Sequence, residues 1–141
     1  MMSEGRGSLS PMWSPDFYAA EHGIEVVEDD IPETGRYYHA HRLIALRTGM
    51  TALSRRCALA HELAHHHYGD TCTSPRIEAR ADRWAANRLI RVSDVVRCAV
   101  ERPEHPEHWC DELMVTPHML RTWISNPNNH RRAEQLWRLV A

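Results

Sequence analysis

The feature that most constrains this chain is a pair of histidines four residues apart, His61 and His65, in a segment that lacks glycine and proline. Residues 53–68 are rich in alanine, leucine and arginine, which favours a helix. On a helix both imidazoles project from one face, at the spacing that a single Zn²⁺ ion needs from two nitrogen ligands. Glu62 completes an H-E-x-x-H motif, and this motif predicts a metal-dependent peptidase.

A third metal ligand is expected from a second helix. Ser74 and Pro75 are typical of a helix start, and Glu78 follows in the first turn of that helix, seventeen residues after His61. If the two helices pack against each other in antiparallel directions, the Glu78 carboxylate points at the two imidazoles. Asp70, which comes shortly after the first helix, is the alternative ligand.

Each residue of this group has an expected role. Three protein ligands leave one position open for water, which is the catalytic pattern, and two imidazoles with one carboxylate suit Zn²⁺, with Mn²⁺ as the alternative. Glu62 is predicted to be the general base that takes a proton from water and passes it to the leaving amine. Asp82 lies one turn after Glu78. We expect it to accept a hydrogen bond from a ligand imidazole and so fix the tautomer of that ring, although a salt bridge to a neighbouring arginine is an equal alternative.

The group that stabilises the transition state is less sharply indicated. Tyr37, Tyr38 and His39 are the first candidates, followed by His41 and Arg80, and ordinary strand packing is the alternative for the two tyrosines. All of these except Arg80 belong to a segment, 36–47, that we expect at the edge of a sheet, where a substrate peptide can add as a strand.

The rest of the pattern predicts an α+β fold. We expect a mostly helical, zincin-like domain in which a small N-terminal antiparallel sheet packs on the helix of the H-E-x-x-H motif. Residues 1–11 are predicted to be a disordered tail, 12–102 the peptidase-like domain, and 103–141 a helical C-terminal segment packed on it. Strands are expected at 24–28 and within 36–47, and the expected helices are 16–22, 51–68, 75–91, 93–101, 109–113, 116–124 and 129–140.

Residues 109–124 resemble a helix-turn-helix, with Val115 directly before a Thr116 that is placed to cap the second helix. Residues 105–141 hold four arginines against four acidic residues, so the basic surface typical of a DNA-binding domain is missing. Only His118, Arg121 and Thr122 are placed to read bases. We therefore expect a packing or substrate-docking unit, with direct nucleic-acid binding as the less favoured alternative.

Composition excludes some other classes of protein. The formal net charge of −2 gives no general attraction to nucleic acid or anionic membranes, and the absence of lysine excludes Schiff-base chemistry through a lysine. The four cysteines form no C-x-x-C pair, so a four-cysteine zinc site is not indicated, and Cys57 is expected to be a buried packing thiol. With neither a signal peptide nor a transmembrane run apparent, we expect a cytoplasmic protein; the sequence does not indicate an oligomeric state.

Two segments together resemble the ImmA/IrrE family of metallo-endopeptidases: residues 60–66, A-H-E-L-A-H-H, and residues 78–90, E-A-R-A-D-R-W-A-A-N-R-L-I. The second helix of that family follows the pattern E-x-x-A-x-x-F-A-x-x-L-L, in which Trp84 here takes the aromatic position. The resemblance covers about residues 24–125. It implies a gluzincin-like domain in which His61, His65 and Glu78 bind zinc, Glu62 is catalytic, and the substrate is a helix-turn-helix repressor of phage, mobile-element or stress genes. A non-catalytic, metal-binding anti-repressor or a DNA-binding protein is the alternative.

Overall fold

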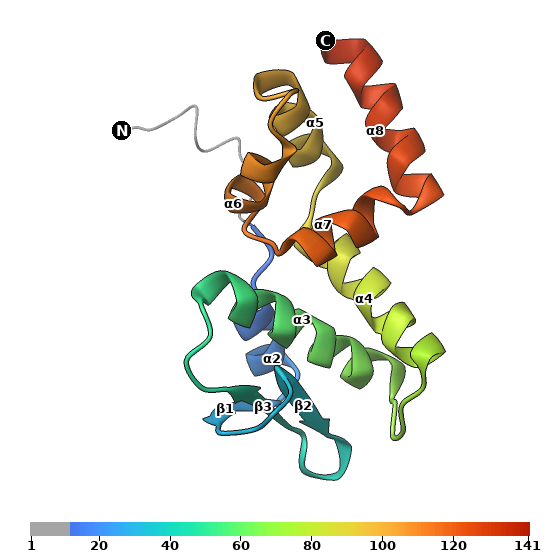
Figure 1. Ribbon diagram of the computed structural model, residues 1–141. Helices are drawn as coiled ribbons and strands as arrows, with labels where there is room; N and C mark the ends of the chain where they lie inside the picture. The colour runs from blue at the N-terminus through green and yellow to red at the C-terminus, as the bar shows by residue number, and fades with distance from the viewer. Residues whose placement is uncertain (1–11) are drawn as a thin grey trace.

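The computed structural model describes residues 12–141, so the predicted tail 1–11 lies outside the described residues. These residues form one small sheet and seven α-helices, with the sheet at one end of the molecule (Figure 1). The α+β fold class expected from the sequence is confirmed. The elements are α2 (Pro15–Glu21), β1 (Glu25–Asp29), β2 (Gly35–Tyr38), β3 (Leu43–Arg47), α3 (Ala52–Tyr68), α4 (Pro75–Leu89), α5 (Val92–Glu101), α6 (Trp109–Leu113), α7 (Pro117–Ile124) and α8 (Pro127–Val140).

The sheet is mixed, which corrects the expectation of a purely antiparallel one. Its strand order is β1-β3-β2; β2 runs antiparallel to β3, whereas β1 runs parallel to it. The turn at residues 32–35 joins β1 to β2, but β3 lies between these two strands. β3 carries the most apolar stretch, with Ile44 and Leu46 fully buried, and such a strand is most stable in the centre of a sheet.

Helix α3 lies on the sheet and forms the centre of the molecule. Thr51 caps its start, where the hydroxyl accepts a hydrogen bond from the backbone N–H of Ser54, and Gly69 ends it with a positive φ of 69°. Leu59 and Leu63 are fully buried on the face that contains the core. This packing fixes the helix that carries the H-E-x-x-H motif.

Helix α4 packs on α3 through small side chains. Ala60 and Ala64 of α3 and Ala81 and Ala85 of α4 are all fully buried, which allows the two backbones to approach closely. Ser74 caps α4 as expected, because its hydroxyl accepts the backbone N–H of Ile77. The side chains in the first turns of α4 are therefore held beside the motif helix.

The four C-terminal helices form the end of the molecule opposite the sheet (Figure 1). Helix α7 packs against α4, and α5 packs against α8. The starts of α5 and α8 differ from the expected ones in their capping. α5 begins at Val92 without a side-chain cap from Ser93, and α8 begins at Pro127 because the side chain of Asn126 caps it. Within residues 12–141 no helix is both long and apolar enough to cross a membrane.

Candidate metal centre

His61, His65 and Glu78 come together between α3 and α4. His61 Nε2 lies 2.8 Å from Glu78 Oε1, and His65 Nε2 lies 3.2 Å from Glu78 Oε2. One ligand atom from each of the three residues lies within 4.8 Å of the others. The residues that the sequence singled out thus converge on one point, with two ring nitrogens and one carboxylate.

The opposite nitrogen of each imidazole contacts an aspartate. His61 Nδ1 donates to Asp82 Oδ1 at 2.7 Å, and His65 Nδ1 donates to Asp70 Oδ2 at 2.9 Å. A carboxylate accepts hydrogen bonds only, so these contacts place a proton on Nδ1 of each ring, and the opposite Nε2, which faces Glu78, is the nitrogen that would bind a metal. Asp82 thus makes the contact expected from the sequence. Asp70, the alternative ligand, instead contacts the imidazole of His65 and is not one of the three converging residues.

The geometry of the α3–α4 connection explains the position of Asp70. The positive φ of Gly69 turns the chain back, and the backbone N–H of Asp70 donates to the carbonyl of His65 at 2.9 Å. The Asp70 carboxylate is consequently held beside the imidazole of His65. Thr73, further along the connection, donates its hydroxyl to Glu78. No sequence pattern indicates this contact, because it depends on the path of the connecting loop.

Glu62 is buried next to these residues. Burial raises the pKa of its carboxyl group; the nearby imidazoles of His61 and His65 oppose this rise, and the charges of Glu78 and Glu33 add to it. Gly35 of β2 lies against its side chain, such that a Cβ atom at this glycine would lie 2.9 Å from Glu62 Cγ. A carboxylate with a raised pKa is well suited to accept and return a proton near neutral pH.

The other ionisable groups are coupled to one another. Burial lowers the pKa of His61, but the hydrogen bond to Asp82 and the charge of Glu62 outweigh this effect and raise it to about 9. Burial raises the pKa of Glu78, but hydrogen bonds from Thr73 and His61 lower it on balance. Burial also raises the pKa of Asp82, but hydrogen bonds from His61 and His118 lower it on balance. The site therefore holds ionised carboxylates that stabilise positive charge.

The donor set fits a zinc ion. In a tetrahedral site with bonds of about 2.0–2.1 Å, the ligand atoms are spaced by roughly 3.3 Å. The contacts of 2.8 and 3.2 Å between the two Nε2 atoms and Glu78 are close to this spacing. The two aspartates hold a proton on Nδ1 of each ring, so Nε2 is the nitrogen that would be offered to a metal.

Open cavities flank Glu62 and Glu78 on two sides. One, of about 430 Å³, is lined by residues of β2 and of the α3–α4 connection, and it includes Tyr37 and His39. The other, of about 390 Å³, is lined by residues of α3, α4 and α7, and it includes His61 and His118. Both include Gly35 at the start of β2, which is an edge strand. Together they can accommodate an extended peptide on either side of the candidate metal position.

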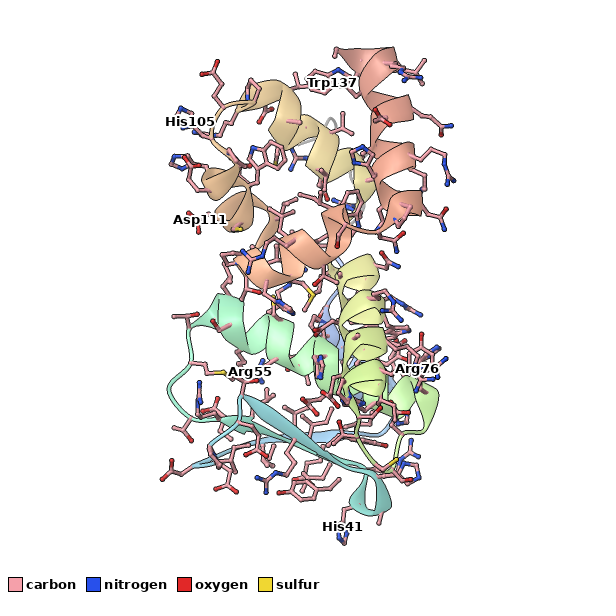
Figure 2. The ribbon with its side chains drawn as sticks, turned by 45° about the vertical axis from the view of Figure 1, so that its right-hand side comes forward. His41, Arg55, Arg76, His105, Asp111 and Trp137 are labelled. Carbon is pink, nitrogen blue, oxygen red and sulfur yellow. The ribbon has the colours of Figure 1, made fainter. Side chains whose placement is uncertain are left out.

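The residues predicted to stabilise the transition state differ in whether they line these cavities. Tyr37 lines the first cavity, and its hydroxyl lies 3.2 Å from His66 Nδ1 and 3.4 Å from His39 Nδ1. Tyr38 lines neither cavity, and its hydroxyl accepts a hydrogen bond from Arg36. Figure 2 shows His41 at the tip of the turn between β2 and β3, away from the candidate ligands.

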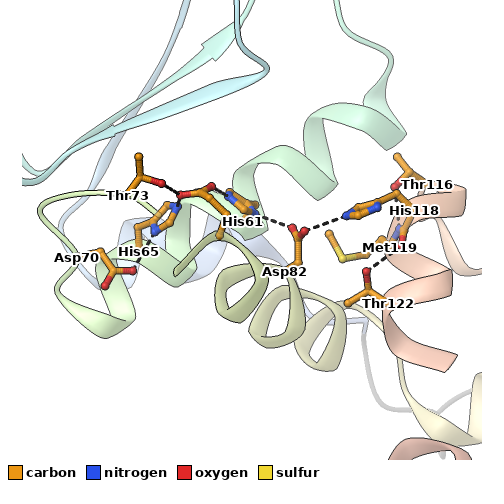
Figure 3. Close-up of polar contacts among 10 residues, drawn as sticks. His61, His65, Asp70, Thr73, Asp82, Thr116, His118, Met119 and Thr122 are labelled. Carbon is orange, nitrogen blue, oxygen red and sulfur yellow. Dashed lines mark hydrogen bonds and ion pairs between the residues drawn. The ribbon is translucent and has the colours of Figure 1, made fainter. Parts of the chain in front are cut away.

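Two further residues contact the aspartates. Arg80 donates to Asp70 Oδ1 at 2.6 Å. His118 Nε2 lies 2.9 Å from Asp82 Oδ2, a contact drawn in Figure 3. Arg80 was expected as a possible oxyanion stabiliser and His118 as a possible base-reading residue. In the structure, both of these side chains are paired with the carboxylates beside the candidate ligands.

Fold and ligand geometry together define a metallopeptidase-like domain. The model of the peptidase family described as the IrrE N-terminal-like domain matches residues 19–102, and the chain belongs to this family. Membership points to the metallopeptidase class, and His61, His65 and Glu78 form a group that could hold a metal ion. The resemblance stated from the sequence is thereby confirmed. The comparison with curated proteins finds no match.

A solved structure described as a Mycobacterium tuberculosis transcriptional regulator has a similar fold. Its TM-score is 0.61 at 16% sequence identity, and the alignment covers 82% of this chain and 41% of that chain. The present chain thus spans less than half the length of that protein. At this identity the similarity shows the fold alone.

Proposed function

We propose that this protein is a zinc-dependent endopeptidase that cleaves a helix-turn-helix transcriptional repressor in the cytoplasm and so derepresses phage, mobile-element or stress genes. The observation that carries the proposal is the convergence of His61 Nε2 and His65 Nε2 on the Glu78 carboxylate, with the buried carboxyl of Glu62 beside them. Family membership supports peptide-bond hydrolysis. The resemblance to ImmA/IrrE peptidases supplies the substrate class, and the structural neighbour's name as a transcriptional regulator is consistent with gene control.

In the proposed mechanism, His61, His65 and Glu78 hold the metal, and Asp82 and Asp70 fix the two imidazoles. When bound, zinc supplies Lewis acidity, which polarises a peptide carbonyl and lowers the pKa of water. Mn²⁺ is the alternative ion for this donor set.

The proton transfers are assigned to Glu62. Its carboxylate takes a proton from the attacking water and delivers it to the nitrogen of the leaving amine. The raised pKa of Glu62 favours both steps, because the group binds the proton firmly enough to carry it and releases it to the more basic amine. Tyr37 and His39, which line the cavity beside Glu62, are proposed to donate hydrogen bonds to the carbonyl oxygen as it gains negative charge.

The substrate is proposed to bind along β2. This strand is at the edge of the sheet, and it begins at Gly35, which lines both cavities. An extended segment of the repressor can add to this edge through backbone hydrogen bonds. We further propose that residues 12–102 form the peptidase domain and that 103–141 are a helical segment packed on it.

Co-expression tests this proposal in cells. The repressor encoded nearest to the gene is produced with either the wild-type chain or Glu62→Gln, together with a reporter under that repressor. We expect wild type alone to switch on the reporter and to produce a shortened repressor fragment. If both proteins relieve repression equally without a fragment, the chain acts as a stoichiometric anti-repressor and the peptidase proposal is wrong.

A further inference from the structure

The two imidazoles of the proposed metal site are supported in parallel ways. Each donates its Nδ1 proton to an aspartate, and each aspartate is held through its second oxygen by another side chain. Asp70 is held by Arg80 at 2.6 Å, and Asp82 is held by His118 at 2.9 Å. Figure 3 shows the second arrangement, with Asp82 placed between two histidine rings.

The two supports come from different parts of the chain. Arg80 belongs to α4, the same helix as Glu78, and its guanidinium stacks on Tyr68 with 3.9 Å between Cζ and the ring centroid. His118 belongs to α7, which lies outside residues 19–102, the part that matches the family model. The His61 side of the site therefore depends on a residue that the family match does not include.

Helix α7 is fixed in the position that this contact requires. Arg56 of α3 donates to the carbonyl of Met114 at 2.7 Å, and the backbone N–H of Thr116 lies 3.4 Å from the Cys57 sulfur. Thr116 also caps α7, because its hydroxyl accepts the N–H of Met119. His118 is thus presented to Asp82 by a turn that is tied to the motif helix itself, although its own side chain is 62% exposed.

We propose that His118 is a positioning residue of the metal centre, which holds Asp82 and through it fixes the tautomer and orientation of His61. The contacts form a continuous series, from His118 Nε2 to Asp82 Oδ2 and from Asp82 Oδ1 to His61 Nδ1. This inference rests on the proposed metal site. It adds that α7 is part of the catalytic unit.

The expected effect is moderate. Removal of a hydrogen-bond partner of a metal ligand weakens metal binding by about 10–100-fold, and His118 is one contact further from the metal and exposed to solvent. We expect His118→Ala to weaken zinc binding by about tenfold, at the lower end of that range. His118→Gln should restore most of the loss, because the glutamine amide can donate from nearly the position of Nε2.

The test is a double-mutant cycle on zinc affinity. Zinc alone is titrated into the metal-free full chain in competition with a chromophoric chelator, for wild type, His118→Ala, Asp82→Ala and the double variant. The spectrum of the Co²⁺-loaded protein reports separately on the geometry of the ligands. His130→Asn is the matched control, since His130 is an exposed histidine of the same C-terminal segment whose side chain pairs with Glu134.

We expect His118→Ala to weaken zinc binding and to change the Co²⁺ spectrum in the wild-type background. In the Asp82→Ala background, we expect the same substitution to have little further effect. Equal losses in both backgrounds, or an unchanged affinity and spectrum, would overturn the role of His118 while the metal site stands. If the wild-type chain binds no zinc, the metal site and this inference are both wrong.

Discussion

The position of the Glu62 side chain depends on Gly35, a residue that has no side chain of its own. Gly35 opens β2 directly against it, and a Cβ atom there would lie 2.9 Å from Glu62 Cγ and 3.2 Å from both Glu62 Oε2 and Leu46 Cδ2. The first of these distances is too short for a normal contact, so any larger residue forces Glu62 or the strand to move. The requirement for glycine is steric, and it links the edge strand to the proposed general base.

Gly35→Ala is therefore expected to impair catalysis more than metal binding. A displacement of about 1 Å at a reacting group can reduce the rate by about 100-fold, and we expect kcat to fall by at least about tenfold while zinc affinity is unchanged. Peptide hydrolysis and chelator competition measure the two quantities. Ala40→Ser, at an exposed position, is the control for adding one side-chain atom. A Gly35→Ala protein with wild-type kcat would show that Glu62 does not need this contact.

The residues nearest the proposed metal differ in how far the sequence could predict them. His61, His65 and Asp82 occupy the places that helical spacing predicts, and Glu78 meets the two imidazoles because its helix packs on theirs. Asp70 was considered as a ligand, but only the positive φ of Gly69 explains why it turns back to His65. The contact between Asp82 and His118 joins residues 36 positions apart, and no local pattern indicates it.

At the scale of elements, the start of α4 positions Glu78. Ser74 accepts the N–H of Ile77, and Glu78 follows in the first turn, where the positive end of the helix dipole stabilises a carboxylate. Fraying of this turn would release both the cap and the carboxylate. The stability of one helix end is thus coupled to the geometry of the candidate metal centre.

Ser74→Ala is expected to lower the free energy of unfolding of the metal-free protein by about 1 kcal/mol, because the N–H of Ile77 loses its partner. Urea denaturation measures this change. Ser74→Thr keeps a capping hydroxyl and should lie much closer to wild type. Equal stability of wild type and Ser74→Ala would mean that the cap does not contribute to holding α4.

Helices were more predictable than the sheet for a physical reason. Helix ends are set by local residues: Thr51 and Ser74 cap the starts of α3 and α4, Gly69 ends α3, and these boundaries lie within one residue of the expected ones. The order of strands in a sheet depends instead on which strand is most apolar, because the central position is the most buried. The apolar β3 takes the centre, and β1 consequently pairs parallel to it across a connection that contains β2.

For the whole molecule, metal binding should be coupled to folding. The candidate ligands come from two helices that are brought together only by tertiary packing, so the unfolded chain offers no preformed site. An ion that binds only the folded state raises the free energy of unfolding by about 2.7 kcal/mol at a concentration of 100 Kd.

Zinc is accordingly expected to raise Tm by roughly 5–10 °C at saturation, and a chelator should reverse the change. Thermal unfolding followed by circular dichroism measures the shift. The double variant His61→Ala/His65→Ala serves as the comparison and should show little or no shift. An equal rise in both proteins would indicate that zinc binds elsewhere.

The most direct test of the central claim compares purified, zinc-loaded wild type with Glu62→Gln on the repressor, followed by intact-mass spectrometry. At equal zinc occupancy, we predict that wild type yields two fragments whose masses sum to the repressor plus one water. Glu62→Gln should be slower by at least about 100-fold, because the proton acceptor is lost while the metal ligands remain. Cleavage by Glu62→Gln at the wild-type rate would contradict the role of Glu62 and the mechanism built on it.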